Sequence, residues 1–274
     1  VQRAQEQRPG FELDDTEGPA VAELVARLEG IPLALELAAA RLRSMTVADI
    51  NRRLKNRFKL LTGGSSVRDA RQQTLRGLVD WSYELLQPDE QAVLCRLAVF
   101  SGGFDLGAAE AVCADDDAIE ADDVLDRVDS LVEKSLVGVE TRGGSARYRM
   151  LETIREYAAE KLDADGGREA VAARHCAHYF ELAKQGRNGM QGPEQGRWLD
   201  RLELEQDNLR AAMAAAQAGI GGIDPLVAVK MAVALQNFWI MRGGTAEGRA
   251  AVRGLLDHPA VQALPMAQAH ALYV

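Results

Sequence analysis

The 274-residue sequence has three cysteines, few aromatic residues and no long apolar run. Cys95, Cys113 and Cys176 are far apart and none belongs to a Cys-x-x-Cys pair, which excludes a disulfide framework and predicts reduced thiols. No stretch approaches the about 18 consecutive apolar residues of a transmembrane helix, and the start lacks the features of a signal peptide. We therefore expect a cytoplasmic protein that makes no membrane contact.

Motifs of common catalytic and phosphate-binding sites are also missing. The sequence has no Gly-x-x-x-x-Gly-Lys-[Ser/Thr] loop, so nucleotide phosphates would find no cradle of backbone N–H groups. No nucleophile-elbow motif accompanies the four histidines. His175, Cys176 and His178 lie close together, but further ligands at the spacing of a metal site do not stand out. We expect no catalytic residue, no metal and no cofactor in this chain, which we do not expect to be an enzyme.

Basic residues are outnumbered by acidic ones, 32 to 41, and the formal net charge is −9. This balance argues against broad non-specific binding of nucleic acid, because phosphate contacts need clustered Lys and Arg. A hydrophobic content of 47% is that of an ordinary globular protein. The length allows roughly two domains of about 100–200 residues.

Helical periodicity dominates the sequence. Apolar residues recur at i, i+3, i+4 and i+7 over residues 20–28, and Pro32 can occupy the first turn of a second helix. Thr46 is a plausible N-cap of a third helix. The polar, glycine-containing stretch 62–73 predicts a linker that closes a helical domain of residues 1–73.

The next segment predicts a winged-helix domain over residues 74–165. A helix is expected at 74–86, and the pattern then predicts three helices followed by two short strands, at 88–100, 106–113, 121–135, 136–141 and 146–150. Three helices followed by a β-hairpin is the order of a winged helix.

The remaining residues, 166–274, predict antiparallel, TPR-like helix pairs, although a strict tetratricopeptide consensus is not met. The expected helices span 168–185, 197–218, 225–242, 245–257 and 266 to the end. The apolar segment 234–244 is expected to be buried between pairs. The fold class is thus mainly α: a helical subdomain, a winged helix with a small β-hairpin, then helix pairs. Because the first residue is not Met and the end falls within a helical pattern, we expect a section of a longer protein.

Five stretches occur in an order found in a known family: "LEGIPLALELAAARL", "RQQTLRGLVDWSYELL", "LAVFSGGF", "RYRMLETIREYA" and "LEQDNLRAAM". Together they resemble bacterial STAND-type signalling ATPases, relatives of the NB-ARC proteins that include transcriptional regulators of the LuxR or SARP kind. The resemblance covers roughly residues 1–245. It implies an upstream nucleotide-binding domain, with ATP or ADP and Mg²⁺ bound in the full-length parent. It also implies a helical repeat sensor that receives a protein or small-molecule signal at the C-terminal helices.

Gly30, Ile31 and Pro32 resemble the family's Gly-x-Pro motif, which implies a contact with the adenine of the nucleotide. Glycine lets the backbone approach a ligand closely, and proline presents a rigid apolar face. The alternative is that Pro32 merely begins a helix, where its missing N–H costs nothing.

Met150, Leu151 and Glu152 align with the family's Met-His-Asp motif, which senses the nucleotide phosphates. Here leucine replaces histidine and glutamate replaces aspartate, and leucine cannot hydrogen-bond a phosphate. The alternative is structural: Met150 and Leu151 are buried, while Glu152 begins a helix near the positive end of its dipole.

The charge of the third winged-helix segment, residues 121–135, bears on DNA binding. Five acidic residues stand there against Arg127 and Lys134, and in a major groove these carboxylates would face phosphates. The predicted wing offers only three arginines, Arg142, Arg147 and Arg149. We therefore do not expect this domain to bind DNA, and interpret it as a hinge or packing module.

The resulting hypothesis is a regulatory section of a STAND-type ATPase transcriptional regulator. A signal at the C-terminal helices would shift the winged helix against the upstream nucleotide-binding domain and change the population of an autoinhibited state. Two alternatives stay open: a winged-helix regulator that binds DNA directly, and a passive helical-repeat scaffold for protein interactions.

Overall fold

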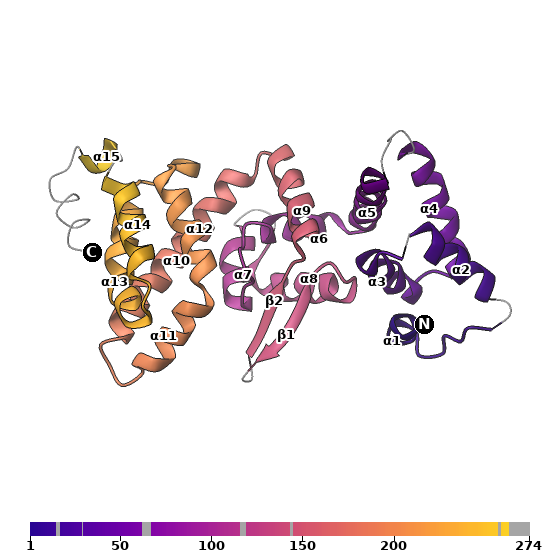
Figure 1. Ribbon diagram of the computed structural model, residues 1–274, viewed down its shortest axis with the longest axis horizontal. Coiled ribbons are helices and arrows are strands. Elements are labelled where there is room, and N and C mark those ends of the chain that lie inside the picture. The colour runs from indigo at the N-terminus through magenta and orange to yellow at the C-terminus, as the bar shows by residue number, and fades with distance from the viewer. Residues whose placement is uncertain are drawn as a thin grey trace. The chain divides into compact units, whose positions relative to one another are not determined.

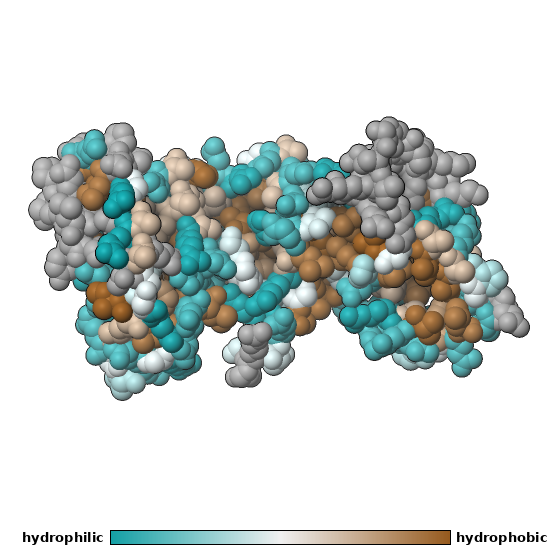
Figure 2. All heavy atoms as spheres, viewed as in Figure 1, coloured by the Kyte–Doolittle hydropathy of each residue, from teal (hydrophilic) through white to brown (hydrophobic). Residues whose placement is uncertain are grey.

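The computed structural model describes residues 1–14, 17–28, 30–61, 67–115, 119–142, 145–256 and 259–262. These residues are mainly helical, with one two-stranded sheet among them (Figure 1), which confirms the predicted fold class. Polar and charged side chains cover much of the face in Figure 2, with apolar ones between them, as is usual for folded domains. No helix within these residues combines the length and the apolar character needed to cross a lipid bilayer.

The chain forms two compact units that each contain part of the winged helix. The first comprises Val1–Leu94, Asp126–Val139 and Met150–Tyr157, and the second comprises Cys95–Leu125, Glu140–Arg149 and Ala158–Val274. The predicted boundaries at residues 73 and 165 stay predictions.

The first unit begins with the helices α1 (Gln2–Gln7), α2 (Gly18–Arg27), α3 (Pro32–Ala40), η1 (Arg41–Arg43), α4 (Val47–Leu61) and α5 (Val67–Glu84). Its core forms where α3 packs on α1 and α5, and where α4 packs on α2 and α5. Pro32 occupies the first position of α3, as predicted. Thr46 caps α4, because its Oγ1 accepts the backbone N–H of Asp49 at 3.2 Å.

The linker predicted at residues 62–73 is wrong in its second half, since α5 begins at Val67. Residues 62–66 lie outside the described residues. Polarity suggested a loop, but Arg, Ala and Gln, which dominate residues 68–73, are all good helix formers.

The winged helix follows the predicted order: α6 (Pro88–Leu97), α7 (Leu106–Cys113), α8 (Ala121–Glu133), β1 (Gly138–Arg142), β2 (Ser145–Arg149) and α9 (Glu152–Ala164). Asp105 caps α7 by accepting the backbone N–H of Ala108 at 2.8 Å. Between α6 and α7, Gly103 has a φ of 117°, and a Cβ there would lie 2.8 Å from the carbonyl oxygen of Tyr148. Only glycine therefore lets this loop approach β2, where Phe104 pairs with Tyr148.

The second unit continues with α10 (Arg168–Gly189), α11 (Gln195–Leu204), α12 (Gln206–Gln217), η2 (Ile220–Gly222), α13 (Leu226–Arg242), α14 (Thr245–Leu256) and α15 (Pro259–Gln262). Helix α10 packs on α12 and α13, α12 packs on α13, and α13 packs on α14. The helix predicted over 197–218 is instead two helices with a break at Glu205. The helix predicted from residue 266 lies outside the described residues.

The segment 234–244 is only partly buried, contrary to the sequence-based expectation. Phe238 and Trp239 are buried, but Ile240 is 58% exposed and Met241 is 49% exposed. Apolar residues surround α13 on all sides, whereas its packing partners cover only part of its surface.

Glu90, in the first turn of α6, is a buried carboxylate of the first unit. Its oxygens accept hydrogen bonds from the Ser130 hydroxyl at 2.6 Å and the Gln87 backbone N–H at 2.8 Å, and it forms an ion pair with Lys134. Burial by itself raises the pKa of Glu90, but these donors outweigh it, and the pKa lies below its ordinary value. The folded state therefore holds Glu90 ionised.

We expect Glu90→Gln to lower the free energy of unfolding by about 1–3 kcal/mol at neutral pH, because three donors lose a charged acceptor. Since the folded-state pKa is depressed, this stabilisation is present above the unfolded-state pKa and is lost as pH falls through the folded-state pKa. Urea unfolding of both proteins from neutral to acidic pH measures the difference, which should shrink in acid. Asp126→Asn, at an exposed position of α8, is the control and should change stability by less than about 0.5 kcal/mol. A Glu90→Gln difference that is constant with pH would contradict the expectation.

Candidate functional site

The exposed face of α8, the third helix of the winged helix, is acidic. Its buried side is formed by Val124, Val128 and Leu131, and its exposed carboxylates belong to Asp122, Asp123, Asp126, Asp129 and Glu133. Arg127 pairs with Asp89 at 2.5 Å, and Lys134, just after the helix, pairs with Glu90. A nucleic acid on this face would meet carboxylates, and nearby basic residues already have acidic partners.

The expectation that Arg147 is available on the wing is wrong, because this residue of β2 is buried. Arg147 forms an ion pair with Glu205, and its Nη2 donates to the carbonyl oxygens of Gly103 at 3.1 Å and Leu204 at 3.0 Å. Arg149 is exposed, whereas the side chain of Arg142 lies outside the described residues. Arg147 therefore holds the wing to the helical repeat and is not offered to a ligand.

Glu205 stands at the break between α11 and α12 and is 4% exposed. Besides Arg147, the Tyr179 hydroxyl donates to its Oε2 at 3.0 Å and the Asn208 amide at 2.9 Å. The break between α11 and α12 thus coincides with a carboxylate that is held by tertiary contacts. Helical periodicity is a local property of the sequence, so it could not predict this break.

Asn208 completes this buried cluster. Its amide group also donates to the Gly103 carbonyl oxygen at 2.7 Å, and its Oδ1 accepts the Ser101 backbone N–H at 2.7 Å. His175 Nε2 lies 3.5 Å from the same Oδ1. We call Arg147, His175, Tyr179, Glu205 and Asn208 the wing–repeat cluster. It joins β2 and the loop before α7 to α10 and α12.

Burial sets the protonation states in the wing–repeat cluster. Burial, together with the nearby His178, lowers the pKa of His175 from 6.5 to about 4, so the ring is neutral at physiological pH. Burial and the Glu205 carboxylate raise the pKa of Tyr179. The cluster therefore contains one cation and one anion, and it contains no exposed nucleophile. Its chemistry suits a structural junction.

His175, Cys176 and His178, which the sequence places together, are explained by packing. His175 and Cys176 are buried and His178 is half-buried, and the His175 ring contacts those of Phe100 and Tyr179. Across the described part of the chain, no group of three or more His, Cys, Asp or Glu side chains is arranged to hold a metal ion.

The Gly-x-Pro residues form the exposed entry to α3. Gly30 has a φ of +66°, a Cβ placed on it would have no atom within 4 Å, and Ile31 is the extended N-cap residue. Pro32 is exposed at the first helical position. The backbone is shaped as a helix start, and its apolar surface is open to a ligand. The adenine contact stays a prediction.

For the second motif, Met150 to Glu152, the structural alternative predicted two buried residues followed by a helix start, and the structure departs from it most clearly at Leu151. Glu152 begins α9 as predicted, and Arg155 Nε donates to its Oε2 at 3.0 Å. This hydrogen bond is the main cause of the lowered pKa of Glu152. Met150 is half-buried, but Leu151 is 53% exposed, so its predicted burial is wrong. Leu151 directly precedes α9, whose core contact is made further along by the buried Ile154.

Comparison with known proteins agrees with the winged helix. Residues 86–163, which contain α6 to α8 and all of α9 except its last residue, match the family described as "Winged helix-turn-helix domain". The structure and this match together define a winged-helix domain of the helix-turn-helix class.

Three mycobacterial relatives are 44% identical to the chain. "Putative HTH-type transcriptional regulator Rv0890c" of Mycobacterium tuberculosis (strain ATCC 25618 / H37Rv) and "Putative HTH-type transcriptional regulator Mb0914c" of Mycobacterium bovis (strain ATCC BAA-935 / AF2122/97) align over 93% of this chain. "Uncharacterized protein Rv0894" of M. tuberculosis aligns over 65% of it. The chain spans 28% of the length of the first two and 45% of the third. The first two names describe transcriptional regulators, and none of the three mentions a nucleotide-binding switch.

We expect Glu205→Gln to lower the free energy of unfolding by about 3–5 kcal/mol, because Arg147 would remain buried without a counter-charge. Urea unfolding followed by circular dichroism measures the change. Glu203→Gln is the matched control: Glu203 is exposed in the last turn of α11, two residues before Glu205, and pairs with Arg242 at 3.3 Å, so its loss should cost less than about 1 kcal/mol.

The double variant Arg147→Met/Glu205→Leu should recover much of the lost stability, since neither charge would then be buried. If Glu205→Gln were as stable as Glu203→Gln, the wing–repeat cluster would not be the junction described here.

Proposed function

We propose that this chain belongs to a transcription regulator, in which the winged helix and the helical repeat act as a regulatory region. The observation that carries the proposal is the winged-helix match over residues 86–163, together with the names of relatives that are 44% identical. The structure supports a regulatory role for the repeat because the wing–repeat cluster connects it to the wing through buried hydrogen bonds.

The mechanism we propose is a population shift. A protein or small-molecule signal on α10 to α14 would favour one position of α12, whose residue Asn208 holds the loop before α7. Because the same cluster holds Arg147 of β2, a change in α12 would alter the position of the wing. The winged helix would then act by the contacts it makes with other protein domains.

A second candidate function is direct binding of DNA by the winged helix. The family description and the "HTH-type" names favour it, and they favour it over a nucleotide-coupled mechanism. The acidic face of α8 and the burial of Arg147 argue against α8 reading a major groove. The two candidates differ in one measurable property, the affinity of the chain for duplex DNA.

Our proposal predicts no salt-dependent binding of this chain to a labelled DNA duplex, measured by fluorescence anisotropy at low and moderate salt. It further predicts that the α8 variant Asp122→Asn/Asp123→Asn/Asp126→Asn also shows no salt-dependent binding of DNA. The control, Glu169→Gln/Glu181→Gln/Glu194→Gln, removes the same charge from exposed positions of the helical repeat.

The second candidate, direct DNA binding, predicts that the chain does bind the duplex. The wild type would then bind with an affinity that falls steeply as salt rises, and the α8 variant would bind more tightly than the control variant. That outcome would replace our proposal with the second candidate.

We also propose that the full-length parent responds to ATP or ADP with Mg²⁺ bound in an upstream domain, and that this chain itself performs no catalysis. The resemblance at Gly30 to Pro32 supports this, as does the exposure of Gly30 and Pro32 at the entry to α3. If nucleotide had no effect on the parent, the region would be a passive interaction scaffold.

We expect Pro32→Ala in the full-length parent to weaken nucleotide binding about fivefold, through loss of roughly 1 kcal/mol of apolar contact. Pro88→Ala is the matched control, because Pro88 also begins a helix at an exposed position. Titration with a fluorescent ATP analogue measures affinity, and limited proteolysis with and without nucleotide measures the response. Equal nucleotide affinity of the two variants would remove the adenine role from Pro32.

A further inference from the structure

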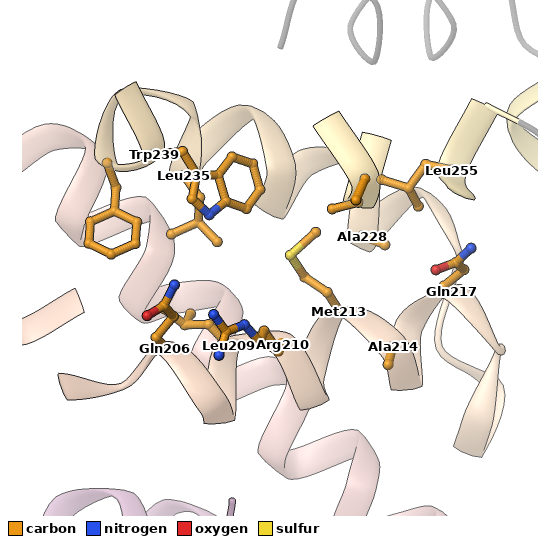
Figure 3. Close-up of a pocket in the computed structure, with 13 residues that line it drawn as sticks. Gln206, Leu209, Arg210, Met213, Ala214, Gln217, Ala228, Leu235, Trp239 and Leu255 are labelled. Atoms are coloured by element: carbon orange, nitrogen blue, oxygen red, sulfur yellow. The ribbon is translucent and has the colours of Figure 1, made fainter. Parts of the chain in front are cut away.

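The second unit contains a half-open pocket of about 240 Å³ between α12, α13 and α14 (Figure 3). In the figure, Leu209 and Met213 of α12 lie opposite Leu235 and Trp239 of α13. Leu255 of α14 and several alanines complete an apolar lining. Phe238 of α13 also belongs to the apolar lining, and the remaining lining residues are polar: Gln206, Arg210 and Gln217. An apolar cavity with a few polar groups is the usual form of a small-molecule site.

The aromatic wall of the pocket is held in place by a close helix contact. Trp239 is 4% exposed, and a Cβ on Gly248 of α14 would lie 2.7 Å from its Cε3 atom. Helix α14 can therefore pack on the indole because residue 248 has no side chain. Met213, in contrast, has a flexible side chain that can adapt to a ligand. The pocket thus combines a fixed flat surface with an adjustable one.

Arg210 is the one charged residue among the described lining residues, and its partner carboxylate lies outside the lining. Arg210 Nη1 donates to Asp207 Oδ1 at 2.8 Å, which balances its charge. Gln217 Nε2 donates to the Gly254 carbonyl oxygen at 3.0 Å and so links α12 to α14. A charged ligand would lose its hydration without gaining an opposite charge that is not already balanced. The lining therefore favours an uncharged ligand.

We propose that this pocket binds a small, uncharged aromatic molecule of one or two fused rings with one hydrogen-bonding group. An apolar cavity of about 150 Å³ accommodates benzene, so a volume of about 240 Å³ has room for a second ring. The flat indole of Trp239 suits an aromatic ring, which gains from offset or edge contacts.

The pocket and the wing–repeat cluster share one helix. Leu209 and Met213 line the pocket, while Asn208, next to Leu209, hydrogen-bonds Glu205 and the loop before α7. A ligand between α12 and α14 is therefore placed to act on the helix that holds the wing. As a signal site this rests on the proposed function, but binding itself can be tested without DNA or nucleotide, so the two can fail separately.

The test is titration calorimetry of this chain with three probes of one size: 2-naphthol, which is neutral, 2-naphthoate, which is anionic, and 2-naphthylmethylammonium, which is cationic. We expect 2-naphthol to bind with a dissociation constant on the order of 100 µM. Each charged probe should bind at least about tenfold more weakly. Failure of 2-naphthol to bind, or tighter binding of a charged probe, would overturn the proposal.

Filling the pocket from two different helices tests its location. Ala250→Phe on α14 and Ala214→Phe on α12 replace exposed lining alanines and should weaken 2-naphthol binding at least about tenfold. Ala246→Phe is the matched control, one turn earlier on α14, exposed and not part of the lining, and should bind as the wild type does. Circular dichroism and thermal unfolding verify that all three variants fold. Equal binding by all variants would place the probe elsewhere and overturn the proposal.

Discussion

The buried ion pair between Arg147 and Glu205 is the constraint on which the second unit depends. Removing two charges from water costs several kcal/mol per ion, and their attraction offsets this only if the remaining polar atoms are also satisfied. Here Tyr179 and Asn208 donate to the carboxylate, and two carbonyl oxygens accept from Arg147 Nη2, while Arg147 Nε is buried without a hydrogen-bond partner among the described residues. The pair therefore fixes four segments at once: β2, the loop before α7, α10 and the start of α12.

This constraint also limits what the winged helix can do. An arginine on a wing is a natural phosphate ligand, but Arg147 is committed to Glu205, and α8 exposes carboxylates. These properties support our proposal that the winged helix transmits a change of position and does not read a base sequence. The helix-turn-helix match identifies the domain, whereas our proposal for how it acts depends on where its charges lie.

Much of the fold could be predicted from the sequence, because helix faces and helix ends are local properties. Pro32 and Thr46 mark helix starts through their own backbone or side-chain chemistry. The break at Glu205 could not be predicted, since the contacts of its carboxylate come from residues 26 and 58 positions away. The surrounding sequence, "RLELEQDNLR", is polar at most positions, so Glu205 and Asn208 do not stand out in it as buried residues.

The apolar pocket could not be predicted from the sequence either, because it exists only through a tertiary contact: the close approach of α14 to Trp239. The regulatory role that we propose for the pocket can be put in thermodynamic terms. A ligand shifts an equilibrium only by the difference between its affinities for the two states, and couplings between sites are about 1–3 kcal/mol. Leu209 contacts the pocket and its neighbour Asn208 holds the loop before α7, so a small movement of α12 would change both environments. A coupling of that size would not need a longer chain of contacts between the pocket and the wing. The single helix α12 forms a wall of the pocket and also part of the junction with the wing.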